Sequence, residues 1–311
     1  MKGYADAHCD TAVKLFGRGE GLRRNGLHLD LERLSAFPGS LQVFALWLDP
    51  KYYPIALRQT MKYLTFYKSE LERNKDLIRP VYTYEDLLKN QKEGRLSALL
   101  SLEGGEALEG ETAVLEVFYE LGVRMMTLTW NYRNQIADGV LDGETGGGLT
   151  PFGKRVIRKM EELGMAVDVS HLSDAGFYDV ANMAKRPFLA SHSNARAVCP
   201  HPRNLTDDQL RILKEIDGFV GLNFYPRFVA EKETVTQEDL LRQLYHLVEK
   251  AGEDHVGFGS DFDGIDTTPS DLRQVEDMAG FLARLEREFG RETAAKLRQE
   301  NLTAALGRIL K

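Results

Sequence analysis

The sequence predicts an α/β protein: a closed (β/α)8 TIM barrel formed by a single domain of residues 1–311. Two observations indicate this fold class. Eight short apolar segments follow one another along the chain, most of them separated by helical segments, a pattern typical of a parallel sheet. No linker-like change in composition divides the 311 residues, and barrels of this length are routinely one domain. With 43% hydrophobic residues, the chain can also bury a large core.

Each predicted strand is a short run of apolar and β-branched residues that ends at polar or glycine residues. The eight strands are predicted at residues 4–11, 40–48, 96–102, 124–129, 166–170, 187–191, 219–223 and 256–260.

The predicted helices have apolar residues at helical spacing or clear capping signals. They are expected at residues 54–75, 84–91, 112–121, 151–163, 175–184, 205–216 and 237–251, with further helices in 271–311. Thr150 and Pro151 are suited to begin one helix and Gly164 to end it. Residues 132–149 contain five glycines and no periodic apolar face, so we expect a long functional loop there.

Composition and charge exclude several classes of function. The net charge of -7, without a block of Lys or Arg, argues against nucleic acid as a partner. Two cysteines, Cys9 and Cys199, form no disulfide framework, and Cys9 is expected to be a buried packing residue. No signal peptide and no run of about 18 apolar residues is visible. We therefore expect a cytoplasmic protein without a membrane partner.

Six chemically capable side chains fall at predicted strand ends. Because the carboxyl ends of barrel strands share one mouth, these side chains should converge although they are far apart in sequence. They are His8, Asp10, Glu103, His171, His192 and Asp261. The other four histidines, His28, His201, His246 and His255, do not occupy strand ends, so the placement is not automatic.

Nitrogen and oxygen donors of this kind suit zinc or a similar divalent ion. Six candidates exceed the three protein ligands of a typical catalytic zinc, and a carboxylate can bridge two ions, so two metals are the better count. Each residue also has an ordinary alternative. His8 and Asp10 could form a polar strand end, either of the other histidines could be a hydrogen-bonded polar residue, and Glu103 could be a charge at a helix N-terminus.

Seven segments, in order along nearly the whole chain, give the sequence a family resemblance. They are Asp6-Ala7-His8-Cys9-Asp10, Ser101-Leu102-Glu103-Gly104-Gly105, Leu149-Thr150-Pro151-Phe152-Gly153, Asp168-Val169-Ser170-His171, Ala190-Ser191-His192-Ser193, Arg203-Asn204 and Gly259-Ser260-Asp261-Phe262-Asp263-Gly264. On these segments the chain resembles the membrane dipeptidase (renal dipeptidase) family of binuclear zinc peptidases, which have amidohydrolase-like barrels.

The resemblance implies a division of roles among the site residues. His8, Asp10 and Glu103 would hold one zinc, and Glu103, His171 and His192 the other.

The substrate would also have assigned partners. Arg203 and the backbone near Tyr225 would receive its carboxylate, while Asp261 and Asp10 would face its amine and the reacting water. Glu103 and Asp261 are thus the implied catalytic residues. An arginine fork suits a carboxylate, and a carboxylate beside the water can transfer its proton to the leaving amine. Without the resemblance, Arg203 could equally form an ordinary loop salt bridge.

The chain departs from the renal members of this family at one position. Those members have a histidine after Thr-Leu-Thr, whereas here Trp130 and Asn131 follow Thr127-Leu128-Thr129. An indole N–H donates one hydrogen bond and cannot accept a proton. We therefore expect Trp130 or Asn131 to contact the substrate in its place, and the bulk of Trp130 to narrow the pocket.

These observations together predict a cytoplasmic dipeptidase with two Zn2+ ions per chain. The resemblance implies that its substrate is a dipeptide with free ends, with a D residue tolerated or preferred on the carboxyl side. Two alternatives remain open: a binuclear hydrolase of another amide or of a lactone, which would not need Arg203, and an inert metal-binding protein. A homodimer is neither required nor excluded.

Overall fold

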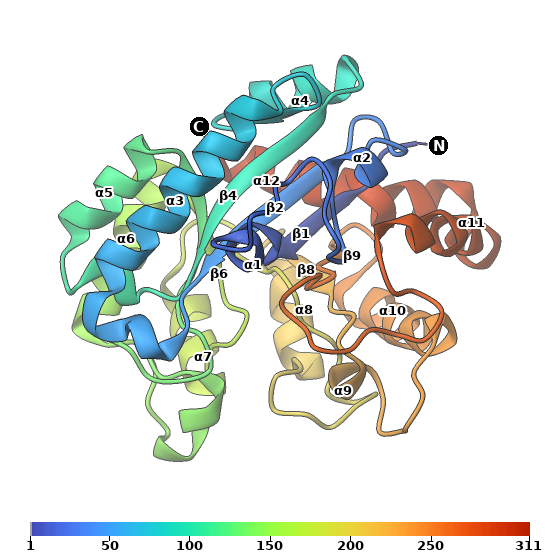
Figure 1. The fold of residues 1–311 in the computed structure, drawn as a ribbon. Coiled ribbons are helices and arrows are strands. Elements are labelled where there is room, and N and C mark those ends of the chain that lie inside the picture. Colours follow the sequence, from blue (N-terminus) through green and yellow to red (C-terminus); the bar gives the residue numbers. More distant parts are fainter. Residues whose placement is uncertain (1) are drawn as a thin grey trace.

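A computed structural model describes residues 2–311, and its centre is a barrel of eight parallel strands (Figure 1). The strands are β1 (Ala5–Cys9), β2 (Leu41–Trp47), β4 (Leu96–Glu103), β5 (Val123–Thr127), β6 (Ala166–Asp168), β7 (Leu189–Ala190), β8 (Phe219–Leu222) and β9 (Val256–Phe258). They are ordered β2-β1-β9-β8-β7-β6-β5-β4, and β2 pairs with β4 from Leu41 to Trp47, which closes the ring. The predicted (β/α)8 barrel and its eight strands are confirmed.

Helices surround the strands on the outside, with α3, α5 and α6 on one side and α10 and α11 on the other (Figure 1). The helices are α1 (Thr11–Leu15), α2 (Leu31–Leu34), α3 (Ala56–Arg73), α4 (Tyr84–Lys92), α5 (Thr112–Glu120), α6 (Pro151–Leu163), α7 (Asp174–Met183), α8 (Asp207–Glu215), α9 (Pro226–Val229), α10 (Gln237–Ala251), α11 (Met278–Ala295) and α12 (Asn301–Ile309). Shorter turns are η1 (Pro50–Ile55), η2 (Glu106–Leu108), η3 (Val140–Thr145), η4 (Val275–Asp277) and the π-helical η5 (Lys296–Glu300).

Capping side chains fix where several helices begin. The Thr150 hydroxyl accepts from the Gly153 N–H at the start of α6, and Gly164 ends that helix with a φ of 80°. Ser173 caps α7 by accepting from the Gly176 N–H. Each of these contacts satisfies a backbone group that has no partner within the helix.

Two sequence-based expectations were wrong in detail. The first strand was predicted to run to Thr11, but it ends at Cys9, and α1 begins at Thr11 because the Lys14 N–H donates to the Asp10 carbonyl. The strand β3 (Ile78–Pro80), which pairs with the beginning of β4, was not predicted. Its three residues are too few for a recognisable pattern.

The end of the barrel opposite the site is filled with apolar side chains. Inward-facing residues of β1, β2, β4 and β5 pack there against α12, whose Leu302, Ala305, Leu306 and Ile309 are buried. Both ends of the described chain lie here, away from α9 (Figure 1). The polar strand ends are therefore left to the opposite, C-terminal mouth, where barrel sites are built.

None of the helices within residues 2–311 has both the length and the apolar composition that crossing a membrane requires.

Candidate functional site

The six side chains predicted to converge do meet at the C-terminal mouth of the barrel. His8 is in β1 and Glu103 is the last residue of β4, while the other four follow strand ends by one to three residues. All six are buried, with at most 9% of their surface exposed. The predicted convergence is therefore a feature of the fold.

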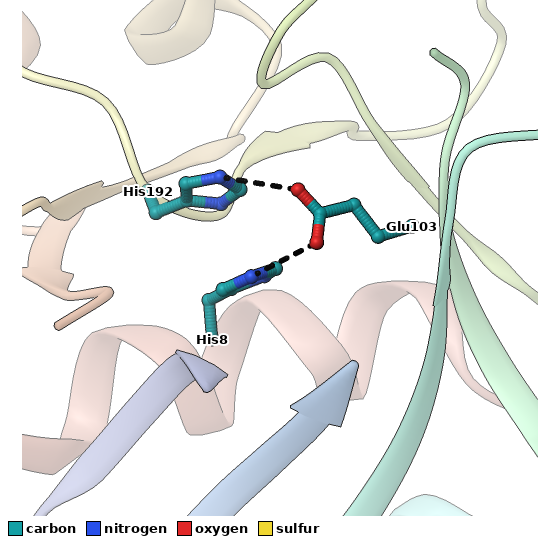
Figure 2. Close-up of side chains that lie close together, drawn as sticks. All are labelled: His8, Glu103 and His192. Carbon is teal, nitrogen blue, oxygen red and sulfur yellow. Dashed lines mark ion pairs between the residues drawn. The ribbon is translucent and has the colours of Figure 1, made fainter. Parts of the chain in front are cut away.

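Glu103 faces both His8 and His192 and presents one carboxylate oxygen to each (Figure 2). Its Oε2 atom is 3.4 Å from His8 Nε2. Its Oε1 atom is 3.1 Å from His171 Nε2 and 3.9 Å from His192 Nε2. A carboxylate placed in this way can serve two groups of ligands at once.

The His8 side of Glu103 is rich in carboxylate oxygens. His8 Nε2 lies 3.3 Å from Asp10 Oδ2 and 3.9 Å from Asp261 Oδ1. Neither ring nitrogen of His8 has a hydrogen-bond partner among the described residues, although the ring is fully buried. A buried nitrogen without a partner is costly, so its environment calls for a further ligand.

Around the Oε1 atom of Glu103, lone pairs face one another. The two Nε2 atoms of His171 and His192 are 2.9 Å apart. The Asn131 Oδ1 atom lies 2.7 Å from His171 Nδ1 and can only accept, so the ring hydrogen is on Nδ1 and Nε2 carries a lone pair. That lone pair points toward Glu103 Oε1, and a cation between these acceptors would relieve their repulsion.

The charges of the buried carboxylates are poorly balanced by protein groups. Burial, together with the adjacent Glu103, raises the pKa of Asp10 to about 6. Burial also raises the pKa of Asp261 to about 7, with His8 opposing and Asp10 adding to the shift. Burial opposes ionisation of Glu103 too, but His8 and His171 together outweigh it and hold the pKa of Glu103 below its ordinary value.

Of the three histidines, only His8 supplies compensating charge. Burial lowers the pKa of His171 to about 4 and that of His192 well below its ordinary value. Burial would also lower the pKa of His8, but the Glu103 and Asp10 carboxylates outweigh it and raise that pKa well above its ordinary value.

The residues fit divalent cations on three observations of the structure: unpartnered nitrogens, facing lone pairs and uncompensated carboxylates. Two overlapping groups have ligand atoms within 4.8 Å of one another, His8 with Glu103 and His192, and His8 with Asp10 and Asp261. Nitrogen and carboxylate donors without thiolates suit zinc and similar ions. The second group keeps Asp261 among the six candidate ligands named from the sequence, whereas the family resemblance gave Asp261 a different role.

Two buried aspartates hold the strands beneath the site. Asp6 accepts from the Ser260 N–H at 2.9 Å and the Ser260 hydroxyl at 2.5 Å, which ties β1 to the residues after β9. Asp168 likewise accepts from the Ser191 N–H at 2.8 Å and the Ser191 hydroxyl at 2.6 Å. Neither aspartate was assigned a role from the sequence, although an acidic residue inside an apolar strand was the available signal.

Two site residues have unusual backbone geometry. His171 and Asp261 adopt positive φ angles of 66° and 62°, a region that non-glycine residues seldom occupy. Such conformations cost on the order of 1–3 kcal/mol and persist where surrounding contacts impose them. Sequence patterns gave no sign of these conformations, although Asp and His are among the non-glycine residues that adopt positive φ most often.

A cavity of about 340 Å³ opens above the six residues. Its walls include Trp130, Asn131 and Tyr225, which were expected near the substrate, as well as Asp10 and Asp261. Residues that the sequence did not single out also line it: Lys14, Trp47, Phe228, Gly264, Ile265 and Asp266.

The indole rings of Trp47 and Trp130 form one aromatic wall of this cavity. Their centroids are 5.3 Å apart in an edge-to-face arrangement.

Arg203 lies behind the main cavity and beside a small one of about 10 Å³ that it shares with His171. It is 5% exposed, donates to the His192 carbonyl at 3.1 Å and leaves its Nε without a partner. Burial lowers the pKa of Arg203 to about 10, so the guanidinium stays charged at neutral pH. Among residues 2–311, no carboxylate lies within ion-pair distance of it.

The backbone near Tyr225 was expected to receive the substrate carboxylate, but the Tyr225 N–H is already engaged. It donates to Asn223 Oδ1 at 2.6 Å. A substrate carboxylate at this N–H would have to replace that hydrogen bond. The amide of Asn223 also donates to Asp261 Oδ2 at 3.0 Å, which leaves the Oδ1 atom of Asp261 facing His8.

A closed (β/α)8 barrel with histidines and carboxylates gathered at its C-terminal mouth defines the amidohydrolase-like class of barrels. Within that class, the chain belongs to the membrane dipeptidase family, peptidase family M19, whose family model matches residues 3–310. The resemblance stated from the sequence is thereby confirmed.

Individual relatives agree with this assignment. A dipeptidase of Schizosaccharomyces pombe described as uncharacterized is 37% identical over 203 residues, which cover 64% of this chain but only 49% of that protein. The solved structure of the dipeptidase AC, a metallopeptidase of family M19, has 30% identity and a TM-score of 0.92, with 99% of each chain covered. A Rhodobacter sphaeroides metallopeptidase, solved with a phosphinate mimic of L-Ala-D-Ala, has 30% identity and a TM-score of 0.89 at the same coverage.

Proposed function

We propose that this protein is a metallodipeptidase with two zinc ions, which hydrolyses dipeptides that have free amino and carboxyl ends and tolerates a D residue on the carboxyl side. One observation carries the proposal: Glu103 presents a separate carboxylate oxygen to each of two histidine groups. Membership of the membrane dipeptidase family supports peptide hydrolysis. The Rhodobacter sphaeroides relative, solved with a mimic of L-Ala-D-Ala, supports the tolerance of a D residue.

The ligands divide into two groups that share Glu103. His8 and Asp10 would hold one cation with Glu103, and His171 and His192 the other. Two such ions would supply an activated water near neutral pH and would polarise the scissile carbonyl.

Asp261 would move a proton between the water and the leaving amine. Asn223 holds its Oδ2 atom at 3.0 Å, so that Oδ1 points toward the His8 side of the site. A carboxylate fixed in this way can accept a proton from the attacking water and return it to the amine nitrogen as the peptide bond breaks. The same carboxylate and that of Asp10 would attract the ammonium group of the substrate.

Arg203 would recognise the carboxyl end of the dipeptide. The buried Arg203 guanidinium is stabilised by Asp261, Glu103 and Asp168 only from beyond ion-pair distance, and its Nε has no partner, so an incoming carboxylate would pair with it through a charge-assisted hydrogen bond. This feature favours a dipeptidase over a hydrolase of neutral amides or lactones, since those substrates have no charge to offer Arg203.

The aromatic wall would limit the substrate's side chains. Trp130 and Trp47 line the cavity together, and Asn131 is engaged with His171. Trp130 therefore replaces the histidine of the renal members with a bulky group that has one hydrogen-bond donor. Small side chains should be favoured next to this wall.

A substrate panel tests the proposal. Zinc-loaded protein would be assayed on L-Ala-L-Ala, L-Ala-D-Ala, and the N-acetylated and C-amidated form of each. We expect both free dipeptides to be cleaved and both kinds of blocked substrate to lose most of kcat/KM. Equal cleavage of the amidated substrates would favour the alternative, a general amide hydrolase. No cleavage of any dipeptide by protein that holds two zinc ions would refute the proposed activity.

A further inference from the structure

Behind His192, two buried residues form a chain of hydrogen bonds that leads away from the site. The Ser191 hydroxyl is 2.6 Å from His192 Nδ1 and 2.6 Å from Asp168 Oδ2. Ser191, His192 and Asp168 have no exposed surface. The three side chains are therefore shielded from water. The hydroxyl hydrogen of Ser191 and the hydrogen on His192 Nδ1, if present, must be donated within this group.

The direction of these hydrogen bonds follows from the donors around Asp168. Its Oδ1 accepts from the Ser170 N–H at 3.0 Å and the Ser191 N–H at 2.8 Å, and its Oδ2 accepts from the Thr127 hydroxyl at 2.6 Å. A carboxylate among so many donors is an acceptor, so the Ser191 hydroxyl gives it its only hydrogen.

The direction at Asp168 decides the hydrogen on His192. Because Ser191 has no second hydrogen, its oxygen can only accept from His192 Nδ1. The alternative target of the Ser191 hydroxyl, Ser170 Oγ, is farther away at 3.4 Å. The ring hydrogen is thus on Nδ1, and Nε2 carries the lone pair.

We propose that Asp168 and Ser191 are positioning residues, which fix the hydrogen of His192 on Nδ1 and so present its Nε2 lone pair to the cation nearest Glu103 Oε1. This inference rests on the proposed function, because it takes His192 to be a ligand. Carboxylates that orient metal-binding histidines are common, and their loss typically costs about 10- to 100-fold in metal affinity.

The backbone around Ser191 is packed so closely that the chain of hydrogen bonds has little freedom to shift. A β-carbon at Gly221 would lie 2.0 Å from the Ser191 carbonyl oxygen, and one at Gly259 would lie 1.8 Å from it. The backbone at Gly221 and Gly259 therefore packs directly against the backbone of Ser191. His192 is held both from behind, by Ser191, and along its backbone.

The chain offers a matched control on the other side of the barrel. Asp6 and Ser260 form the same kind of buried pair, with 2.5 Å between Asp6 Oδ2 and Ser260 Oγ. The remaining contacts of the Ser260 hydroxyl are backbone groups, the His8 carbonyl at 3.4 Å and the Phe262 N–H at 3.2 Å. Ser260→Ala thus removes an equivalent hydrogen bond without touching an imidazole.

Asp168→Asn gives the sharpest perturbation, because it should reverse the direction of the hydrogen bonds that link residue 168, Ser191 and His192. The amide nitrogen cannot occupy the Oδ1 position, where two N–H groups already point. At the Oδ2 position it faces two hydroxyls, which can turn to accept. Ser191 would then donate to His192 Nδ1, and the ring hydrogen would move to Nε2, where it blocks a cation.

The test measures zinc affinity and the position of the ring hydrogen in full-length protein. Chelator competition would follow both zinc ions in the wild type, Ser191→Ala, Asp168→Asn and Ser260→Ala. Nitrogen NMR of the metal-free proteins would report the tautomers of the seven histidines, with His192→Ala assigning the signal of interest. We expect one of two zinc ions to bind about 10- to 100-fold more weakly in the first two variants, with the tautomer reversed in Asp168→Asn.

The inference is overturned if Ser191→Ala and Asp168→Asn keep the wild-type affinity and tautomer. It is also overturned if Ser260→Ala weakens the same zinc ion as much, since bracing of the strands would then explain the effect. Failure of the proposed function would look different: wild-type protein itself would fail to bind two zinc ions or to cleave dipeptides.

Discussion

Gly264 leaves room for two carboxylates of the site, and Gly264→Ala should disable the enzyme without unfolding it. A β-carbon at this position would lie 2.2 Å from Asp261 Oδ1 and 2.3 Å from Asp10 Oδ2. To regain an ordinary non-bonded separation, each oxygen must withdraw by about 1 Å or more. Misplacement of reacting groups by about 1 Å can cost about 10²-fold in rate, so we expect kcat/KM to fall by about that factor.

The cost to stability should be small because the clashes involve only the ends of side chains. Gly264 is exposed, and its φ is not in the left-handed region, so alanine adds no backbone strain. Replacing glycine with alanine at a compatible position stabilises a protein by about 0.4–1 kcal/mol through the unfolded state, which offsets part of the local repulsion. The Tm of the variant should therefore stay within a few degrees of the wild type.

The assay compares kcat/KM for L-Ala-D-Ala, zinc content and Tm in the wild type, Gly264→Ala and Gly280→Ala. Gly280 is the matched control, because a β-carbon there meets no heavy atom within 4 Å. It should leave kcat/KM unchanged. If Gly264→Ala keeps both its zinc and an activity close to the wild type, Asp10 and Asp261 do not face the reacting groups. If its activity falls only in step with unfolding, the reasoning from the site is also refuted.

Three further substitutions probe separate roles. Asp261→Asn should retain both zinc ions and lose at least about 10²-fold in turnover, as measured by kinetics alongside metal analysis, whereas loss of a zinc ion would make Asp261 a ligand. Arg203→Ala should keep its zinc and raise KM for free dipeptides, while its kcat/KM for C-amidated dipeptides stays near the wild-type value; an unchanged KM would remove Arg203 from carboxylate recognition. Trp130→Ala should open the wall next to Trp47 and improve kcat/KM for dipeptides with bulky side chains relative to small ones, and an unchanged profile would place Trp130 outside the substrate's reach.

The fold was predictable because buried parallel strands leave a strong signal. Each barrel strand is a run of apolar residues, and the chain repeats the pattern of strand and helix. What escaped prediction was too short or too local. The strand β3 has only three residues. The first strand gives way to α1 at Asp10, whose carbonyl accepts a backbone hydrogen bond from the Lys14 N–H.

The convergence of the six side chains was predictable for a topological reason, since strand ends of a barrel share one mouth. The buried residues that hydrogen-bond to these six side chains could not be predicted. A hydrogen bond such as that between Ser191 and His192 depends on rotamers that no sequence pattern encodes. The engagement of the Tyr225 N–H by Asn223 likewise depends on the local turn. Polar residues inside apolar strands, such as Asp168, were the one signal that could have directed attention to this layer.

The most direct test of the two-metal account is a titration of metal-free protein with zinc while hydrolysis of L-Ala-D-Ala is followed. Glu103 is placed to serve both histidine groups, so activity should rise to its maximum only as the second equivalent binds. Glu103→Gln should bind both ions poorly, since a neutral amide bridges two cations less well than a carboxylate does. Full activity at one equivalent of zinc, or wild-type zinc binding by Glu103→Gln, would contradict the account.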